Sequence, residues 1–252
     1  MTEYLTTPQG RRIAFDRTEG QGPGVVFLGG FRSDKEGSKA LHLEAWAQAA
    51  GRAFLRLDYS GHGQSSGAFE EGCIGDWYQD AAEAVAALTH GPQIVVGSSM
   101  GGWIALLLAQ RCPERVAALV GIAAAPDFTE RFLADLAPGD RDRLMAEGRL
   151  EIASDYSPEP YVFTRRLIED GAAQRVLDRP LRLAVPVRLL QGTEDTDVPV
   201  AAQLALFAHL DSPDARLTLV KGADHRFSDP ACLRLLGDTV EDLLATLAAP
   251  PA

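Results

Sequence analysis

The sequence predicts a single α/β domain of 252 residues that is organised around a doubly wound, mostly parallel sheet. Two features of the chain indicate this fold class. Short, continuous apolar runs alternate with helix-like stretches, and each run ends in glycine or small polar residues. Such runs are typical of strands buried on both faces, and strands that alternate with helices form parallel sheets. One interruption of the alternation, at about 126–182, is expected to be a small helical cap inserted into the domain.

The composition argues against nucleic acid and membranes as partners. The chain carries 35 acidic and 24 basic residues, for a net charge of -11, which repels phosphate backbones and anionic lipid surfaces. No stretch approaches the length of a membrane span, and residues 1–5 carry no basic flank before an apolar run. Cys73, Cys112 and Cys232 are too far apart for a zinc or redox pair. We therefore expect a cytoplasmic protein whose cysteines are small buried fillers.

The N-terminal half is expected to form an edge hairpin followed by buried strands and their helices. Weak alternation around Gln9-Gly10 predicts an antiparallel hairpin between Tyr4 and Arg17. Continuous apolar runs predict buried strands, and apolar residues at helical spacing predict amphipathic helices. The expected elements are strands at 24–28, 53–57 and 94–96, and helices at 39–50 and 74–89.

The stretch 94–103 indicates a sharp turn from a strand into a helix. Gly97 and Gly101 lie two residues to either side of Ser99, which fits the Gly-x-Ser-x-Gly pattern of a nucleophile elbow. Ser98 does not fit, because valine and methionine would then occupy the glycine positions and crowd the turn. We therefore predict that Ser99 is a nucleophile held in a strained conformation at the start of the helix.

Two backbone N–H groups are candidates for an oxyanion hole. Met100 directly follows the predicted nucleophile, at a helix start where N–H groups have no partner within the helix. A glycine pair ends the buried strand 24–28 and lets the chain turn, so that the N–H of Phe31 faces the cleft. We expect Phe31 and Met100 to stabilise the oxyanion of a reaction at Ser99.

The C-terminal half is expected to complete the sheet after the cap. Val116–Ile122 is a further buried strand, and between about 128 and 181 the strand signal stops and only helix-like pieces remain. Strands resume at 185–190 and 216–220, with helices at 204–210 and 230–248.

The cap contains apolar residues that are candidates for an acyl pocket, although each one alone is more typical of a helix packed on the core. Arg165 and Arg166 are candidates for binding a substrate carboxylate, although such a pair more often faces solvent. The apolar candidates are Phe128, Phe132, Leu136, Tyr156, Tyr161 and Phe163.

Three groups suited to nucleophilic catalysis follow one another along the chain, each after a predicted strand. Ser99 comes first, a cluster of carboxylates follows the strand 185–190, and His225 follows the last strand. The order of nucleophile, acid and histidine is that of the α/β hydrolases. His62 precedes the elbow and has no evident carboxylate to orient it, so we interpret it as structural. The candidate acids are Glu194, Asp195 and Asp197.

On these residues the chain resembles the α/β-hydrolase superfamily over nearly its whole length. It is also similar to the subgroup of mitochondrial palmitoyl-protein thioesterases and acyl-glucuronide esterases, through the segments 30–34, 37–40, 56–61, 91–103 and 224–226. In the superfamily the acid lies shortly before a Val-Pro pair, which here selects Asp195 and leaves Asp197 as the runner-up. The chain shows no transit extension, which points to a bacterial-type cytoplasmic relative, and its cap has diverged.

The resemblance implies an α/β-hydrolase fold and a serine nucleophile that cleaves acyl thioesters or carboxylic esters without a cofactor or metal. The implied substrate is a small-molecule acyl ester or thioester, with an acylated protein as a further candidate. Because the cap has diverged, the acyl-chain preference of the subgroup does not carry over.

Other functions are compatible with the same residues. Dehalogenases and epoxide hydrolases resemble one another in placing an aspartate at the elbow, which Ser99 excludes. Cofactor-free peroxidation and carbon-carbon bond hydrolysis use the same triad. A peptidase would need a cap carboxylate to bind the substrate amine, and Asp127, Glu130 and Asp135 are candidates. A non-catalytic binding module would have no reason to keep every triad position.

Overall fold

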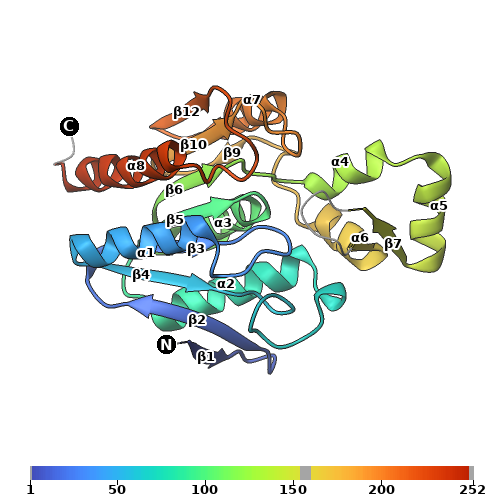
Figure 1. The fold of residues 1–252 in the computed structure, drawn as a ribbon, viewed down its shortest axis with the longest axis horizontal. Coiled ribbons are helices and arrows are strands. Elements are labelled where there is room, and N and C mark those ends of the chain that lie inside the picture. The colour runs from blue at the N-terminus through green and yellow to red at the C-terminus, as the bar shows by residue number, and fades with distance from the viewer. Residues whose placement is uncertain (1, 154–159, 250–252) are drawn as a thin grey trace.

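The computed structural model describes residues 2–153 and 160–249, and its centre is an eight-stranded sheet with helices on both faces (Figure 1). The strand order is β1-β2-β4-β3-β5-β6-β10-β12. Neighbours from β4 to β12 are parallel, whereas β2 runs antiparallel to both β1 and β4. This topology confirms the predicted doubly wound, mostly parallel sheet with a hairpin at one edge.

The elements lie close to the predicted ranges, and α7 differs most because it already begins at Val200, directly after Pro199. The strands of the sheet are β1 (Glu3–Thr6), β2 (Arg12–Thr18), β3 (Gln21–Leu28), β4 (Arg52–Leu57), β5 (Gln93–Ser98), β6 (Val116–Ile122), β10 (Val187–Gly192) and β12 (Ala215–Val220). The helices around it are α1 (Ser38–Ala50), α2 (Ile74–Leu88), α3 (Met100–Arg111), α7 (Val200–His209) and α8 (Pro230–Ala248). The short strands β9 (Leu181–Arg182) and β11 (Leu210–Asp211) pair with each other beside the sheet.

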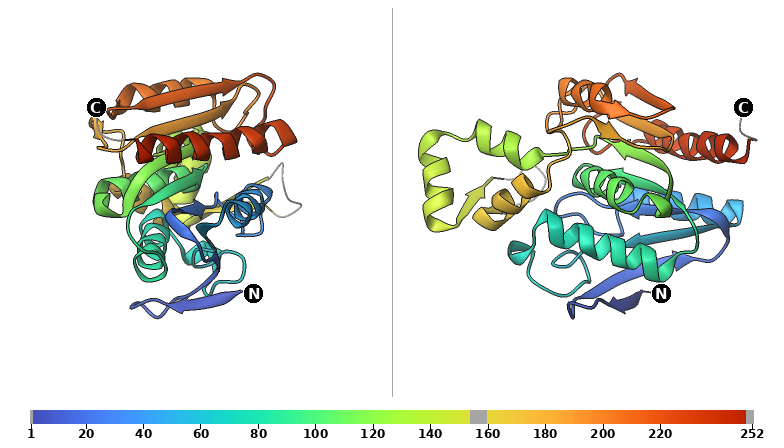
Figure 2. Two further views of the ribbon diagram at one scale, coloured as in Figure 1. Left: turned by 90° about the vertical axis from the view of Figure 1, so that its left-hand side faces the viewer. Right: turned by 180° about the vertical axis from the view of Figure 1, so that it is seen from behind.

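The two faces of the sheet are covered by different helices (Figure 2). α1 and α8 pack on one face through a core that includes Leu43 and Leu236. α2 and α3 pack on the other face through a core that includes the fully buried Trp77 and Trp103. Within the described residues, no helix is both long and apolar enough to cross a membrane.

The cap extends to one side of the sheet (Figure 1) and is not wholly helical. Besides α4 (Phe128–Asp135), α5 (Pro138–Glu147) and α6 (Arg165–Ala173), it contains an antiparallel hairpin of β7 (Arg149–Ile152) and β8 (Tyr161–Thr164). The expectation of helices alone was therefore wrong. Each of these strands has only four residues and is stabilised by its partner and by packing in the cap, which local periodicity does not reveal.

The loop after β3, which carries Phe31, is fixed at its far end by a buried network of charges. The Lys35 ammonium is fully buried and lies 2.5 Å from an Asp16 carboxylate oxygen, and Arg56 lies 3.0 Å from Glu36 and 3.0 Å from Glu44. Burial disfavours the charged carboxylate of Asp16, but the hydrogen bond from Lys35 and the charge of Arg56 outweigh it and lower its pKa. The network joins β2 and β4 to the loop before α1 and to α1 itself.

Glycine is required at the elbow because α3 begins in close contact with its neighbours. A Cβ on Gly101 would overlap the backbone carbonyl of Leu28 in β3, and one on Gly97 would overlap the carbonyl of Gly101. Neither neighbour is a flexible side chain that can move away. The first turn of α3 is therefore held directly against the ends of β3 and β5.

We expect Gly101→Ala to lower the free energy of unfolding by about 1–3 kcal/mol or more, because the added methyl group meets rigid backbone. Gly139→Ala in α5 is the matched control, since nothing lies within 4 Å of its added Cβ, and it should stabilise the protein by about 0.4–1 kcal/mol. Urea unfolding of both variants measures the difference. Equal stabilities would contradict the close packing described for the elbow.

Candidate active site

Ser99 lies between the end of β5 and the first residue of α3, in a backbone conformation that side chains rarely adopt. Its φ is 54° and its ψ is -119°, so the residue is strained as predicted for an elbow. The conformation is held by backbone hydrogen bonds from Ser99 N–H to the Ile122 carbonyl at 2.9 Å and from Ala125 N–H to the Ser99 carbonyl at 3.0 Å. Both Ser98 and Ser99 border the cavity, but Ser98 is buried whereas Ser99 is half-buried.

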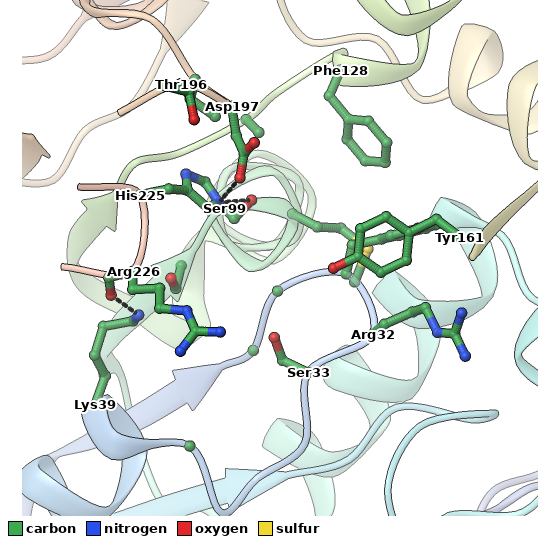
Figure 3. A pocket seen from close by; sticks show the side chains of 18 of the residues that line it. Arg32, Ser33, Lys39, Ser99, Phe128, Tyr161, Thr196, Asp197, His225 and Arg226 are labelled. Atoms are coloured by element: carbon green, nitrogen blue, oxygen red, sulfur yellow. Dashed lines mark hydrogen bonds and ion pairs between the residues drawn. The ribbon is translucent and has the colours of Figure 1, made fainter. Parts of the chain in front are cut away.

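The structure brings the three predicted catalytic residues together. The Nε2 atom of His225 lies 3.2 Å from Ser99 Oγ, and its Nδ1 atom lies 2.9 Å from Asp195 Oδ2. Asp195 follows β10 and His225 follows β12, which are parallel neighbours. Their loops therefore leave the sheet at the same edge, and Figure 3 shows His225 directed at Ser99.

Both oxygens of the buried Asp195 carboxylate accept hydrogen bonds. Oδ1 accepts from the backbone N–H groups of Asp197 at 2.9 Å and Val198 at 2.8 Å, and Oδ2 accepts from Gln191 Nε2 at 3.0 Å as well as from His225. Burial disfavours the carboxylate, but the hydrogen bond from His225 and the others outweigh it and lower the pKa of Asp195. The carboxylate is thus ionised and fixed in orientation.

Gln191 is a site residue that the sequence reasoning missed. Its fully buried side chain donates to Asp195, to the Gly192 carbonyl at 3.0 Å and to the Val198 carbonyl at 2.9 Å. It thereby fixes the loop that presents the acid. The available signal was a single amide at the end of the otherwise apolar run 189–192, directly before the acidic loop.

Asp197, the runner-up for the acid, lies on the other side of the imidazole. Its Oδ2 atom is 3.7 Å from His225 Nε2, the nitrogen that faces Ser99 (Figure 3). An acid that fixes the imidazole must bond Nδ1, because Nε2 has to exchange a proton with the nucleophile. Glu194 and Asp224 are exposed, and neither has a described contact with His225. Geometry therefore favours Asp195.

The two residues expected to form the oxyanion hole border the same cavity as Ser99. Met100 is the first residue of α3, so its N–H has no carbonyl within the helix to bond. The ring of Phe31 is fixed against Phe69 at 4.8 Å and Phe163 at 5.3 Å between ring centres, which anchors the loop that carries its N–H. Their role as oxyanion donors stays a prediction.

His62 contacts the loop that carries Phe31 and Arg32, which agrees with the interpretation of His62 as a structural residue. It is buried, its Nδ1 bonds the Ser60 carbonyl at 3.2 Å, and its Nε2 accepts from the N–H of Arg32 at 3.3 Å. Burial lowers the pKa of His62 to about 4, so the ring is neutral and can act as an acceptor. Arg32 has a positive φ of 55°, a conformation that this hydrogen bond helps to hold.

The cavity in front of Ser99 has a volume of about 870 Å³ and reaches the cap. Of the predicted acyl-pocket residues, Phe128, Phe132, Tyr161 and Phe163 line it, whereas Leu136 packs in the core of the cap. Tyr156 lies outside the described residues.

Neither of the two cap arginines proposed to bind a carboxylate lines this cavity. Arg166 forms an ion pair of 2.7 Å with Asp76 on α2, and Arg165 donates to the Met145 carbonyl at 3.0 Å. These contacts join the cap to α2 and join α6 to α5. Both arginines are exposed, which agrees with the alternative that such a pair more often faces solvent, and the structure does not place them to bind a carboxylate in this cavity.

We expect Asp195→Asn to lower kcat by about 10⁴-fold, because an amide no longer fixes the productive tautomer of His225. Asp197→Asn is the matched control, since it removes the same charge from the same loop without touching Nδ1, and it should cost less than about tenfold. Hydrolysis of a p-nitrophenyl ester measures both. Comparable losses in the two variants would contradict the assignment of the acid.

Comparison with known proteins identifies the family. Residues 25–231 match the model of the Alpha/beta hydrolase family. The mitochondrial palmitoyl-protein thioesterase ABHD10 of Rattus norvegicus is 36% identical over 245 residues, which cover 97% of this chain and 82% of that protein.

Two solved structures are similar over nearly their whole length. The alpha/beta hydrolase domain-containing protein 10 from mouse superimposes with a TM-score of 0.93 at 34% identity, covering 98% of this chain and 100% of that one. A putative hydrolase from Agrobacterium vitis S4 superimposes with a TM-score of 0.92 at 40% identity, covering 96% and 98%. These similarities confirm the predicted fold and the resemblance to palmitoyl-protein thioesterases, and they establish that the chain belongs to the α/β-hydrolase family.

Proposed function

We propose that the protein is a serine hydrolase that cleaves acyl thioesters or carboxylic esters through an acyl-enzyme intermediate. The observation that carries the proposal is the chain of contacts from Ser99 Oγ through His225 to Asp195, with distances of 3.2 Å and 2.9 Å. A hydroxyl beside an imidazole whose other nitrogen bonds a buried carboxylate is arranged for activation as a nucleophile. The similarity to a palmitoyl-protein thioesterase supports an acyl substrate.

In the acylation step, Ser99 Oγ attacks the carbonyl carbon of the substrate while His225 Nε2 removes the hydroxyl proton. Asp195 keeps the proton of Nδ1 in place and stabilises the imidazolium that forms. The backbone N–H groups of Phe31 and Met100 donate to the developing oxyanion. The intermediate then collapses, and His225 gives its proton to the departing thiolate or alkoxide.

In the deacylation step, water takes the place of the leaving group. His225 Nε2 removes a proton from the water as it attacks the acyl carbon, and the same N–H groups stabilise the second oxyanion. Collapse of this intermediate returns the proton to Ser99 Oγ and releases a carboxylic acid. The steps require only the chain's own groups and water.

The cavity wall supports a substrate with an apolar acyl group. Phe128, Phe132 and Phe163 form part of one side, and the rings of Phe132 and Phe163 stack with centres 3.8 Å apart. Apolar walls of this kind bind hydrocarbon by removing it from water. A small-molecule acyl ester or thioester is the proposed substrate, with an acylated protein as a further candidate.

Two of the three cap carboxylates considered for a peptidase are engaged away from the cavity. Of the cap carboxylates considered for a peptidase, Asp127 is buried and accepts the N–H groups of Val176 and Leu177, and Glu130 forms an ion pair of 2.9 Å with Arg175. Only Asp135 lines the cavity. Carbon-carbon bond hydrolysis would use the same three residues, so only kinetic measurements on different substrates distinguish it from ester cleavage.

The single-domain organisation and the cytoplasmic location stay predictions. The similar rat thioesterase is a mitochondrial protein, which does not support a cytoplasmic location for this one.

We expect Ser99→Ala to lower kcat by about 10⁶-fold on every substrate that the wild type hydrolyses, because the triad acts as a unit. The assay is kcat/KM on p-nitrophenyl esters and acyl thioesters of increasing chain length. A loss below tenfold would remove Ser99 from the mechanism. Rapid labelling of the wild type by a fluorophosphonate without turnover of any acyl substrate would keep the triad but direct the search to peptides or carbon-carbon bonds.

We expect Phe132→Ala to lower kcat/KM about tenfold for a medium or long acyl chain and far less for an acetyl group, because only a longer chain reaches the ring. Leu136→Ala is the control, since it removes apolar bulk from the cap core but not from the cavity wall. An equal effect on all chain lengths would indicate that the acyl group binds elsewhere.

A further inference from the structure

The cavity has two chemically different sides with Ser99 between them. In Figure 3, Phe128 and Tyr161 lie on the cap side of Ser99, and Lys39 and Arg226 lie on the opposite side. The wall on that opposite side is polar and is formed by the loop between β3 and α1, by the start of α1 and by the loop after β12. It contains Ser33, Gly37, Ser38, Lys39, Arg226 and Ser228.

Lys39 is a half-buried cation without a counter-ion among the described residues. Its Nζ atom donates to the backbone carbonyl of Arg226, and no described carboxylate lies within ion-pair distance. Burial lowers the pKa of Lys39 to about 8. The negative charge of Asp224 raises this pKa slightly, and the positive charge of Arg226 lowers it further. An ammonium held in this way retains hydrogens that can be donated into the cavity.

The surroundings of Lys39 add positive potential. The guanidinium of Arg226 lies beside it on the cavity wall (Figure 3). Lys39 is also in the first turn of α1, a helix of 13 residues with no acidic side chain in that turn, so the positive end of the helix dipole faces the same side. The carboxylate of Asp34 also lines the cavity, but its Oδ1 accepts the N–H of Glu36 at 2.9 Å.

This arrangement is unexpected for a purely structural lysine. The protein has a net charge of -11, yet a lysine and an arginine lie together on one wall of the cavity that contains the nucleophile. Burying a charge without a counter-ion costs stability. Such a cost is typical of a position that is kept for binding.

We propose that Lys39, Arg226 and the first turn of α1 form a subsite for an anionic group on the leaving-group half of the substrate. The inference rests on the proposed function, because an acyl chain on the aromatic side of Ser99 directs the leaving group to the opposite side. A carboxylate and a phosphate share the chemistry that the subsite recognises. Lys39 is accordingly a specificity-determining residue that binds the charge and does not take part in the proton transfers.

The test uses octanoyl thioesters in two matched pairs. Thioesters of 3-mercaptopropionate and of its methyl ester differ by one carboxylate, and those of 4′-phosphopantetheine and pantetheine differ by one phosphate. Within each pair the acyl group and the reacting bond are the same, so the ratio of kcat/KM for the charged over the neutral member isolates recognition of the charge. We expect a wild-type ratio of about ten or more in at least one pair, and the pair with the larger ratio identifies the preferred anion.

Lys39→Met should lower this ratio about tenfold through a higher KM for the charged member, whereas Lys39→Arg should keep most of it. Lys221→Met is the matched control for net charge, because Lys221 is exposed and does not line the cavity, and it should keep the wild-type ratio. Lys39→Met is also expected to keep or raise the Tm, since it removes a half-buried charge that has no counter-ion among the described residues. If Lys39→Met fails to fold, Lys39→Gln takes its place in the comparison.

Two results would overturn the subsite and leave the proposed function in place. Both assume that the neutral thioesters are hydrolysed in a Ser99-dependent manner. One result is a wild-type ratio near one in both pairs of thioesters. The other is a ratio in Lys39→Met that equals the ratio in Lys221→Met. Absence of Ser99-dependent hydrolysis of all four thioesters would overturn the proposed function, and the subsite with it.

Discussion

The close contact between the start of α3 and the end of β3 is the constraint on which the site depends. Gly101 lies against the Leu28 carbonyl without room for a Cβ, and the chain must therefore turn sharply at Ser99, whose φ is 54°. That turn presents the hydroxyl to the cavity and starts a helix beside it, where the first N–H groups have no partner within the helix. This packing contact therefore fixes the position of the predicted nucleophile and of the helix start beside it.

The parallel sheet brings together residues that are far apart along the chain. β3, β5, β10 and β12 run in the same direction, so the loops that follow them leave at one edge. Asp195 and His225 are 30 residues apart in the chain, yet their side chains are 2.9 Å apart because their strands are neighbours. Groups that follow parallel strands in such a sheet leave at the same edge, where ligands bind.

The groups that position the triad are held by specific polar partners, whereas Lys39 has no ion-pair partner among the described residues. Asp195 accepts four hydrogen bonds, one of them from Gln191, and the neutral His62 supports the loop next to Phe31. These contacts fix geometry at little electrostatic cost. Lys39 keeps its charge on the cavity wall with only a backbone carbonyl as its described partner, which is why we assign it a role in binding.

The sequence alone determined the fold class, the elbow and the order of the triad, because hydrophobic periodicity and glycine placement are local consequences of strand, helix and turn geometry. The residues by themselves offered three acids, and the superfamily resemblance selected Asp195 with Asp197 as the runner-up. Only the tertiary structure shows Asp195 at Nδ1 and Asp197 near Nε2 of His225. The β7–β8 hairpin, the ion pair of Arg166 and the contacts of Gln191 were likewise decided by tertiary packing. The partners range from Asp195, four residues from Gln191, to Asp76, 90 residues from Arg166, and local propensity carries no information about which partner a side chain will meet.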